Sequence, residues 1–94
     1  MYVKVSKIEY VEVYDHATFI YTKNNKYVTK KTLTEWELEL KNHNFIRCHR
    51  SYLVNKYRIK QLQKNYVELF SRKTIPVSRK HHDDLMNSLN DLIE

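Results

Sequence analysis

Apolar and polar residues alternate with a two-residue period along most of the chain, which is the pattern of half-buried β-strands. The pattern predicts strands over 8–14, 18–23, 26–30, 45–49, 58–63, 66–70 and 73–77, and leaves 51–56 open between a strand and one helical turn. Asn24-Asn25 and Lys64-Asn65 predict hairpin turns, because Asn tolerates positive φ and the chain contains no glycine. Pro76 cannot donate to a strand ladder and therefore predicts an edge strand.

Two stretches change to the helical period of 3.6 residues. Residues 32–41 open with a capping box, either Thr32 with Glu35 or Thr34 with Glu37, and carry an apolar stripe of Leu33, Trp36 and Leu40. A second helix follows Ser78, and its apolar stripe consists of Leu85, Met86, Leu89, Leu92 and Ile93. The elements together predict a mainly β fold, with antiparallel strands and hairpins in small sheets and two short peripheral helices.

The 94 residues are enough for one domain with one hydrophobic core. No apolar run approaches the ~20 residues of a membrane-spanning helix, and the first residues lack the pattern of a signal peptide. Cys48 is the single cysteine, so no internal disulfide can form, and a reducing, cytoplasmic location is expected.

Positive charge is concentrated in the second half of the chain. Residues 1–46 carry seven Lys or Arg against six Asp or Glu, and residues 47–80 carry ten against one. Residues 81–94 carry four acids and no Lys or Arg, so the three segments contribute +1, +9 and −4 to the net charge of +6. A basic block of this kind favours polyanionic partners.

The residues give little support to catalysis or to metal binding. Cys48 and His49 are neighbours on a predicted strand and point to opposite faces, so they do not form a catalytic dyad. The five histidines and the cysteine show neither C-x-x-C nor H-x-x-x-H spacing. An enzyme, a bound metal and a cofactor are therefore not expected.

Nucleic-acid binding is the function that the polar residues favour. They gather at predicted strand ends, in the segments "YDHAT" (14–18), "HRS" (49–51), "SRK" (71–73) and "SRKHH" (78–82). Guanidinium groups bind phosphate bidentately and read guanine edges, and hydroxyl groups support phosphate contacts. The tyrosines alternate with apolar residues along strands, which favours core packing over a base-stacking platform.

The segment "FIRCHRSYLVN" (45–55), with Ile59 and "IPVSR" (75–79), resembles the LytTR DNA-binding domain, the output half of bacterial response regulators of the LytR, AlgR and AgrA type. Upstream, "IEYVEVYDHATFIYTKNNKYVTKKTLTEWE" (8–37) is similar to the first strands and first helix of that family. The resemblance covers nearly the whole chain. It implies a mostly β module that inserts loops into successive major grooves, bends the DNA and recognises imperfect direct repeats in promoters.

The resemblance also implies site residues by position. Arg79 matches the arginine that reads bases, and Arg50 matches a position at the DNA backbone. The loop around His16 matches a further contact region, and His16 is expected to contact bases as well. Ser51 fits a phosphate contact or a cap of the following turn equally well, while His49 is expected to tie strands together. The full set expected to contact phosphate is Arg50, Ser51, Arg47, Lys80, Arg72, Lys73 and Lys56.

Family domains usually begin with an additional strand, where this chain has only "MYVKVSK" before the "IEY" segment. Residues 1–94 are therefore expected to be a LytTR-like domain that lacks this strand, either a short standalone version or, as we expect, a fragment of a longer regulator. The expected partners are double-stranded promoter DNA, a second copy on the DNA, and a receiver domain or membrane-bound regulator outside this chain.

Two alternatives stay open. One is a module for RNA or single-stranded DNA, which predicts tyrosines exposed on one sheet face. The other is a protein-interaction domain whose basic block docks an acidic partner.

Overall fold

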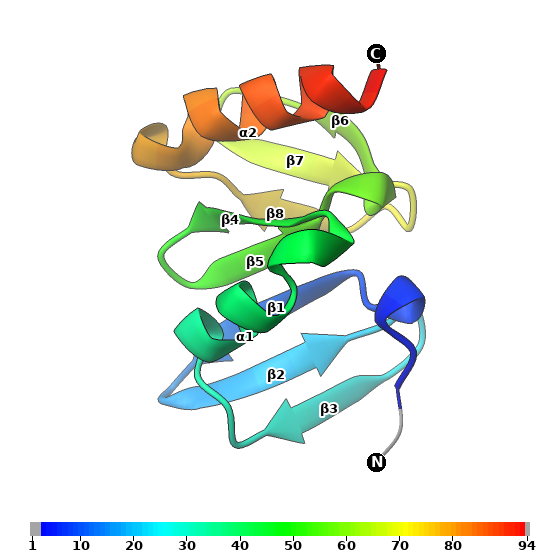
Figure 1. The fold of residues 1–94 in the computed structure, drawn as a ribbon, viewed down its shortest axis with the longest axis vertical. Helices are drawn as coiled ribbons and strands as arrows, with labels where there is room; N and C mark the ends of the chain where they lie inside the picture. The colour runs from blue at the N-terminus through cyan, green and yellow to red at the C-terminus, as the bar shows by residue number, and fades with distance from the viewer. Residues whose placement is uncertain (1–2, 94) are drawn as a thin grey trace.

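Two antiparallel sheets make up the fold, and the computed structural model describes residues 3–93 of the chain. The larger sheet has five strands in the order β3-β2-β1-β5-β4, and the smaller has three in the order β6-β7-β8. The sheets lie one above the other along the long axis of the molecule (Figure 1). The strands are β1 (Tyr10–Tyr14), β2 (Ala17–Tyr21), β3 (Lys26–Thr29), β4 (Phe45–His49), β5 (Tyr52–Asn55), β6 (Ile59–Leu62), β7 (Tyr66–Leu69) and β8 (Thr74–Pro76).

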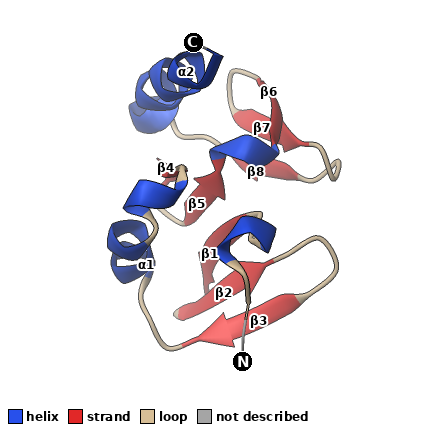
Figure 2. Ribbon diagram, turned by 45° about the vertical axis from the view of Figure 1, so that its right-hand side comes forward, coloured by secondary structure: helices blue, strands red, loops and turns tan. Residues whose placement is uncertain are grey.

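Each sheet has one α-helix beside it, which confirms the predicted mainly β fold with two peripheral helices (Figure 2). Helix α1 (Leu33–Glu39) begins with the capping box of Thr32 and Glu35, the first of the two predicted alternatives. Helix α2 (Arg79–Ile93) follows Ser78 as predicted. Three short 3-10 turns complete the elements: η1 (Val5–Lys7), η2 (Lys41–His43) and η3 (Lys56–Arg58).

The predicted stripe of α2 is only partly a packing surface. Leu85 is fully buried and Leu89 packs against the same core, but Met86 is 42% exposed. The stripe was expected to pack against the core or, if not fully covered, to form a dimer seam. Met86 is not covered, because it directly follows Leu85 and neighbouring residues of a helix point about 100° apart. The side chain of Ile93 lies outside the described residues.

The predicted turns lie where expected, but their backbone differs from the expectation. Pro76 ends β8, an edge strand of the smaller sheet, Lys64-Asn65 lie in the β6–β7 turn, and Asn24-Asn25 join β2 to β3. Neither hairpin turn uses the positive φ on which these turns were predicted. The left-handed residues of the described chain are Asp15, His16, Asn44 and Arg72.

Residues 52–55 of the open segment 51–56 form strand β5, and Lys56 begins the 3-10 turn η3. Strand β5 pairs with both β1 and β4 and so lies inside the larger sheet. Two apolar clusters hold the layers together. One lies between the two sheets and α2 and includes Cys48, Val54 and Leu69, and the other lies between the larger sheet and α1 and includes Val11 and Leu53. Burial raises the pKa of the Cys48 thiol to about 12, so Cys48 is a core residue and a poor nucleophile.

Candidate nucleic-acid interface

Strand pairing brings three chain reversals to one edge of the molecule: the β1–β2 turn, the β4–β5 turn and the junction of β8 with α2 (Figure 1). We call this edge the turn edge and define it by residues 15–16, 50–51 and 78–80. The loops at the opposite strand ends, residues 22–25, 56–58 and 70–73, we call the loop edge.

Backbone hydrogen bonds join the three reversals of the turn edge to one another. The Val13 N–H donates to the Ser51 carbonyl (2.9 Å), which links the first reversal to the second. The Ser78 N–H donates to the Cys48 carbonyl (2.9 Å), which links the third to the end of β4. The reversals therefore hold fixed positions relative to each other.

Asp15 and His16 form the tightest of these reversals. The register pairs Tyr14 with Ala17, so only two residues connect β1 to β2. Their φ angles are 51° and 64°, and positive φ at both central residues is the requirement of a type I′ hairpin turn. Asp and His are among the non-glycine residues that most often adopt this conformation. The turn places the exposed His16 at its tip.

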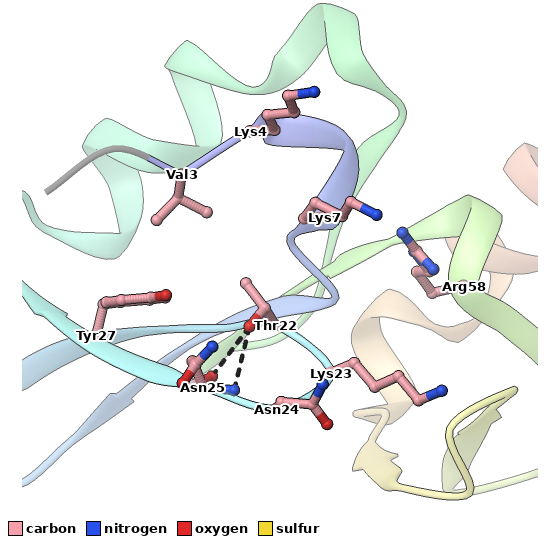
Figure 3. A pocket seen from close by; sticks show the side chains of 9 residues that line it. All are labelled: Val3, Lys4, Lys7, Thr22, Lys23, Asn24, Asn25, Tyr27 and Arg58. Atoms are coloured by element: carbon pink, nitrogen blue, oxygen red, sulfur yellow. Dashed lines mark hydrogen bonds between the residues drawn. The ribbon is translucent and has the colours of Figure 1, made fainter.

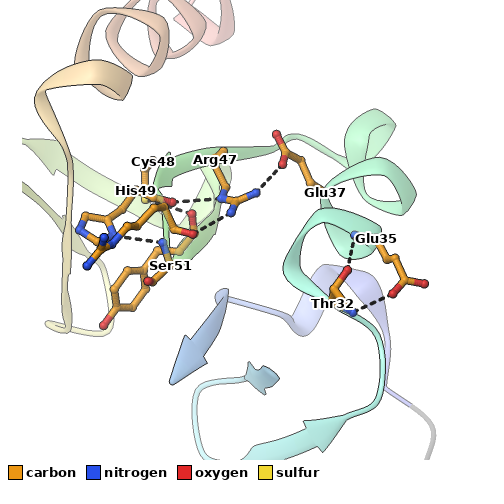
Figure 4. Close-up of polar contacts among 9 residues, drawn as sticks. Thr32, Glu35, Glu37, Arg47, Cys48, His49 and Ser51 are labelled. Carbon is orange, nitrogen blue, oxygen red and sulfur yellow. Dashed lines mark hydrogen bonds and ion pairs between the residues drawn. The ribbon is translucent and has the colours of Figure 1, made fainter. Parts of the chain in front are cut away.

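The β4–β5 turn is held by hydrogen bonds to its backbone (Figure 4). The Ser51 N–H donates to Nδ1 of His49 (3.1 Å), a contact within the turn rather than the tie between strands that was expected of His49. The Arg50 carbonyl accepts from Nη2 of Arg47 (2.7 Å), and the Ser51 carbonyl accepts from Val13. The backbone of the turn is thus fixed, while the side chain of Arg50 is exposed.

The Arg47 guanidinium makes two further contacts that hold this turn against helix α1. Its Nε donates to the His49 carbonyl (3.1 Å), and its Nη1 bonds Oε1 of Glu37 on α1 (2.7 Å). Only 21% of the Arg47 side chain is exposed, and the strand register shifts between Arg47 and His49. Because one guanidinium contacts three groups, Arg47 is placed to position Arg50, and a phosphate contact by Arg47 itself stays a prediction.

The third reversal presents Arg79 and Lys80 on the first turn of α2, where both are exposed. No acid lies in that first turn. Cations at a helix N-terminus oppose the helix dipole, so this placement costs stability unless an anion approaches. The Ser78 hydroxyl lies 2.6 Å from Nδ1 of His81. Burial, with the nearby charges of Lys80 and Arg47, lowers the pKa of His81.

The predicted site residues divide between the two edges. The turn edge brings together His16, Arg50, Ser51, Arg79 and Lys80, with Arg47 behind them. Three other predicted cations lie at the loop edge: Lys56, Arg72 and Lys73.

Two of the cations at the loop edge have partners from distant parts of the chain. Lys73 Nζ is 4.0 Å from the buried carboxylate of Glu9, and Lys56 bonds the Ser88 hydroxyl. Arg72 is exposed on a left-handed turn residue. The phosphate contacts predicted for Lys56, Arg72 and Lys73 stay untested. These residues lie on the opposite edge from Arg79, so a duplex bound along the turn edge would not reach them.

Two further cations at or beside the turn edge were missing from the sequence prediction. Lys30 follows β3, which runs in the same direction as β1 and so ends at the same edge. Lys64 lies in the β6–β7 turn, where the Asn65 carbonyl accepts from the Val77 N–H (2.8 Å) next to Ser78. The strand order would have identified both, since it determines which strand ends meet.

Most tyrosines of the larger sheet contact one another rather than solvent. The rings of Tyr10 and Tyr21 stack with 4.3 Å between their centroids. The hydroxyls of Tyr21 and Tyr52 donate to the two carboxylate oxygens of Glu12, at 2.8 and 2.6 Å. Tyr14 is 69% exposed beside the Asp15-His16 turn, and Tyr57 and Tyr66 are 63% and 41% exposed. The core packing expected from the alternation thus holds for Tyr10, Tyr21 and Tyr52 but is wrong for the strand residues Tyr14 and Tyr66.

Within residues 3–93, no three His, Cys, Asp or Glu side chains are grouped so that they could hold a metal ion. Over the same part of the chain, no helix combines the length and the apolar character needed to cross a membrane.

The family model of the LytTr DNA-binding domain matches residues 1–90. The chain belongs to the LytTr DNA-binding domain family. The fold of this LytTr domain is similar to that of the LytTr DNA-binding domain of a putative methyl-accepting/DNA response regulator from Bacillus cereus, with a TM-score of 0.86 and 29% sequence identity. That match covers 93% of this chain and 84% of the Bacillus cereus chain.

Two groups of curated relatives are longer regulators. The transcriptional regulatory protein YpdB of Escherichia coli (strain K12) is 36% identical over 59 residues, which are 63% of this chain and 24% of YpdB. The transcriptional regulatory protein LytR of Staphylococcus aureus (strain N315) is 46% identical over 46 residues, which are 49% of this chain and 19% of LytR. The matched part of this LytTr domain thus spans at most about a quarter of these relatives, and the similarity supports DNA binding in transcription regulation.

Proposed function

We propose that this LytTr domain binds double-stranded DNA in a sequence-specific manner through its turn edge. One observation carries the proposal: three mutually anchored reversals present His16, Arg50 and Arg79 on one edge. Among the described residues, no carboxylate lies within ion-pair distance of either arginine. A fixed backbone with uncompensated cations is what phosphate and base-edge contacts require.

The size of the molecule supports contact with successive grooves. The whole molecule extends 34 Å along its long axis, so the turn edge can follow a duplex over part of one helical turn, which is about 34–36 Å in B-DNA. The β1–β2 turn lies in the larger sheet, and the start of α2 lies beside the smaller sheet (Figure 1). His16 and Arg79 would therefore enter neighbouring major grooves on one side of the duplex, with Arg50 against the phosphates between them.

Each residue has a role that its surroundings favour. The guanidinium of Arg79 reads a guanine edge bidentately, and the N-terminus of α2 adds favourable electrostatics for a nearby phosphate. Arg50 pairs with phosphate and contributes affinity without base preference. Ser51 and Lys80 add backbone contacts on either side, and Arg47 keeps Arg50 in place.

The wider setting is part of the same proposal. We infer that the domain is the output part of a longer bacterial regulator, since its relatives named as transcriptional regulatory proteins are several times longer than the matched segments. Direct repeats in promoters would then be its sites, and a second copy would occupy the neighbouring repeat.

A selection of bound duplexes from a random pool tests the proposal. Wild type and Arg72→Ala should enrich the same repeated motif, because Arg72 is an exposed arginine on the loop edge. Arg79→Ala should lose the motif at the positions that Arg79 reads. Enrichment of the full motif by Arg79→Ala, or of no motif by wild type, would show that the proposed readout is wrong.

A further inference from the structure

A pocket of about 510 Å³ opens at the loop edge, between η1, the β2–β3 loop and η3 (Figure 3). Four cations from these separate segments line it: Lys4, Lys7, Lys23 and Arg58. No Asp or Glu is among the lining residues. Across residues 3–93, no carboxylate lies within ion-pair distance of any of the four. The pocket is therefore an uncompensated positive site.

This concentration of charge does not follow from the basic block or from the DNA site. Residues 1–46 are nearly neutral, with seven Lys against six acids, yet three of those lysines line the pocket. The segments that line the pocket, η1, the β2–β3 loop and η3, lie at the strand ends opposite the turn edge (Figure 1). A duplex bound at the turn edge would not reach it, so the charge needs a separate explanation.

Hydrogen bonds fix the walls of the pocket. Nη2 of Arg58 donates to the Ser6 carbonyl (2.5 Å), which ties η3 to η1. The Asn25 N–H donates to the Thr22 hydroxyl oxygen (3.2 Å), and the Thr22 N–H donates to the Asn25 carbonyl (2.9 Å). The pocket is thus formed before any ligand enters, which lowers the entropic cost of binding.

The two sides of the pocket differ in chemistry. Figure 3 shows Val3 and Tyr27 on one side, and Lys7, Lys23 and Arg58 directed toward the other. The side-chain amides of Asn24 and Asn25 belong to the loop along its floor. A ligand that matches this lining has a flat apolar ring at one end and an anionic group with several acceptor oxygens at the other.

We propose that this pocket binds a small phosphorylated ligand that carries an aromatic ring, of the nucleoside phosphate class. Lys7, Lys23 and Arg58 bind the phosphate oxygens, the ring packs against Tyr27 and Val3, and the Asn amides bond its polar edge. The volume is that of a pocket for one small molecule, for which about 300–1,000 Å³ is usual. The site is distinct from the turn edge and does not depend on DNA binding there.

Titration of the ¹⁵N-labelled chain with a panel of AMP, ADP, GDP and UDP tests the proposal, with inorganic phosphate and adenosine as partial ligands. At least one nucleotide should change the amide chemical shifts of residues 3–7, 22–27 and 58. The amide chemical shifts of the turn edge should stay unchanged. That nucleotide should bind at least about tenfold more tightly than inorganic phosphate or adenosine, because only the whole ligand contacts both sides.

The double variant Lys7→Ala/Lys23→Ala should weaken nucleotide binding by about tenfold or more, since charge-assisted hydrogen bonds are lost. The matched control is Lys41→Ala/Lys60→Ala, which removes two exposed lysines outside the pocket and should leave nucleotide affinity unchanged. Duplex affinity of the double variant should stay within about threefold of wild type, because phosphate neutralisation by distant lysines is weak.

Four results would overturn the proposal. In the titration, the first is that no nucleotide changes the chemical shift of a pocket amide, and the second is that the changes are confined to the turn edge. The third is equal affinity for a nucleotide and a poly-glutamate peptide. The fourth is a loss of duplex affinity in Lys7→Ala/Lys23→Ala as large as in Arg79→Ala. The last would assign the pocket to the DNA interface.

Discussion

The turn edge and the loop edge both carry exposed cations, but their shapes differ. At the turn edge, two-residue connections such as Asp15-His16 and Arg50-Ser51 project from a backbone fixed by hydrogen bonds. At the loop edge, the chain surrounds a pocket, and Lys73 lies near the carboxylate of Glu9. A projecting edge suits a groove and a concave one suits a small ligand. Clustered charge alone therefore does not locate a DNA site, because the shape of its support matters as much.

The largest effect is expected for the pair Arg79→Ala and Arg72→Ala, which remove one exposed arginine from each edge. Arg79→Ala should weaken binding to the selected duplex by about 1–3 kcal/mol and relax base preference at one position. Arg72→Ala should change that affinity by less than about threefold. Fluorescence anisotropy at fixed salt measures both, and equal losses from the two variants would remove the distinction between the edges.

A smaller loss is expected when the support of the β4–β5 turn is removed. Arg47→Met keeps the apolar stem but leaves the carbonyls of His49 and Arg50 without their donor. The free energy of unfolding should fall by about 1–3 kcal/mol, and duplex affinity should fall by about fivefold at a temperature where the variant is folded. Arg47→Lys should not restore affinity, because an ammonium group cannot replace the guanidinium fork.

Urea denaturation and anisotropy on the same samples separate the two effects of Arg47→Met. A folded variant with wild-type affinity would show that the turn needs no such support.

Arg50→Ala should cause a milder and sequence-independent loss. Because one phosphate contact disappears, the slope of log affinity against log salt should become shallower by about one unit, for selected and random duplexes alike. The same measurement on Lys73→Ala provides the comparison from the loop edge. An unchanged slope for Arg50→Ala, or an equal change for Lys73→Ala, would argue against a phosphate contact at Arg50.

The smallest effect concerns pH. Burial lowers the pKa of His81 below its usual 6.5, so the folded state favours the neutral ring. As the pH falls below about 6.5, the unfolded chain takes up the proton first, and the contribution of His81 to stability is lost toward its lower folded-state pKa. His81→Gln should flatten the pH dependence of stability in this range. If the free energy of unfolding changes by the same amount from pH 7 to pH 5 in variant and wild type, this prediction is contradicted.

The hairpins, the capping box and the edge strand could be predicted because their signals are local. Thr32 and Glu35 are three residues apart, and Pro76 limits its own strand. Strand β5 could not be resolved, because its short apolar run becomes a strand by pairing with the distant β1. The positive φ angles of Asp15 and His16 likewise follow from the pairing of Tyr14 with Ala17, which composition does not reveal.

The candidate site shows the same division between local and distant information. "SRK" at 71–73 and "SRKHH" at 78–82 look alike in sequence, but β8 separates them and places them at opposite edges. The position of Arg47 depends on Glu37 from α1, a tertiary contact. Residue type and strand ends were thus enough to nominate the polar segments, and the resemblance to the LytTR family singled out Arg79 and Arg50 within them. The strand order was needed to group the two arginines.

Amide chemical-shift mapping with a selected duplex tests the DNA-binding role of the turn edge most directly. Binding of the duplex should change the amide chemical shifts of residues 15–16, 50–51 and 78–80. The amide chemical shifts of residues 22–25 and 70–73 should stay unchanged. Shifts centred on residues 22–25 and 70–73, with the turn edge unaffected, would contradict the assignment of the DNA-binding surface.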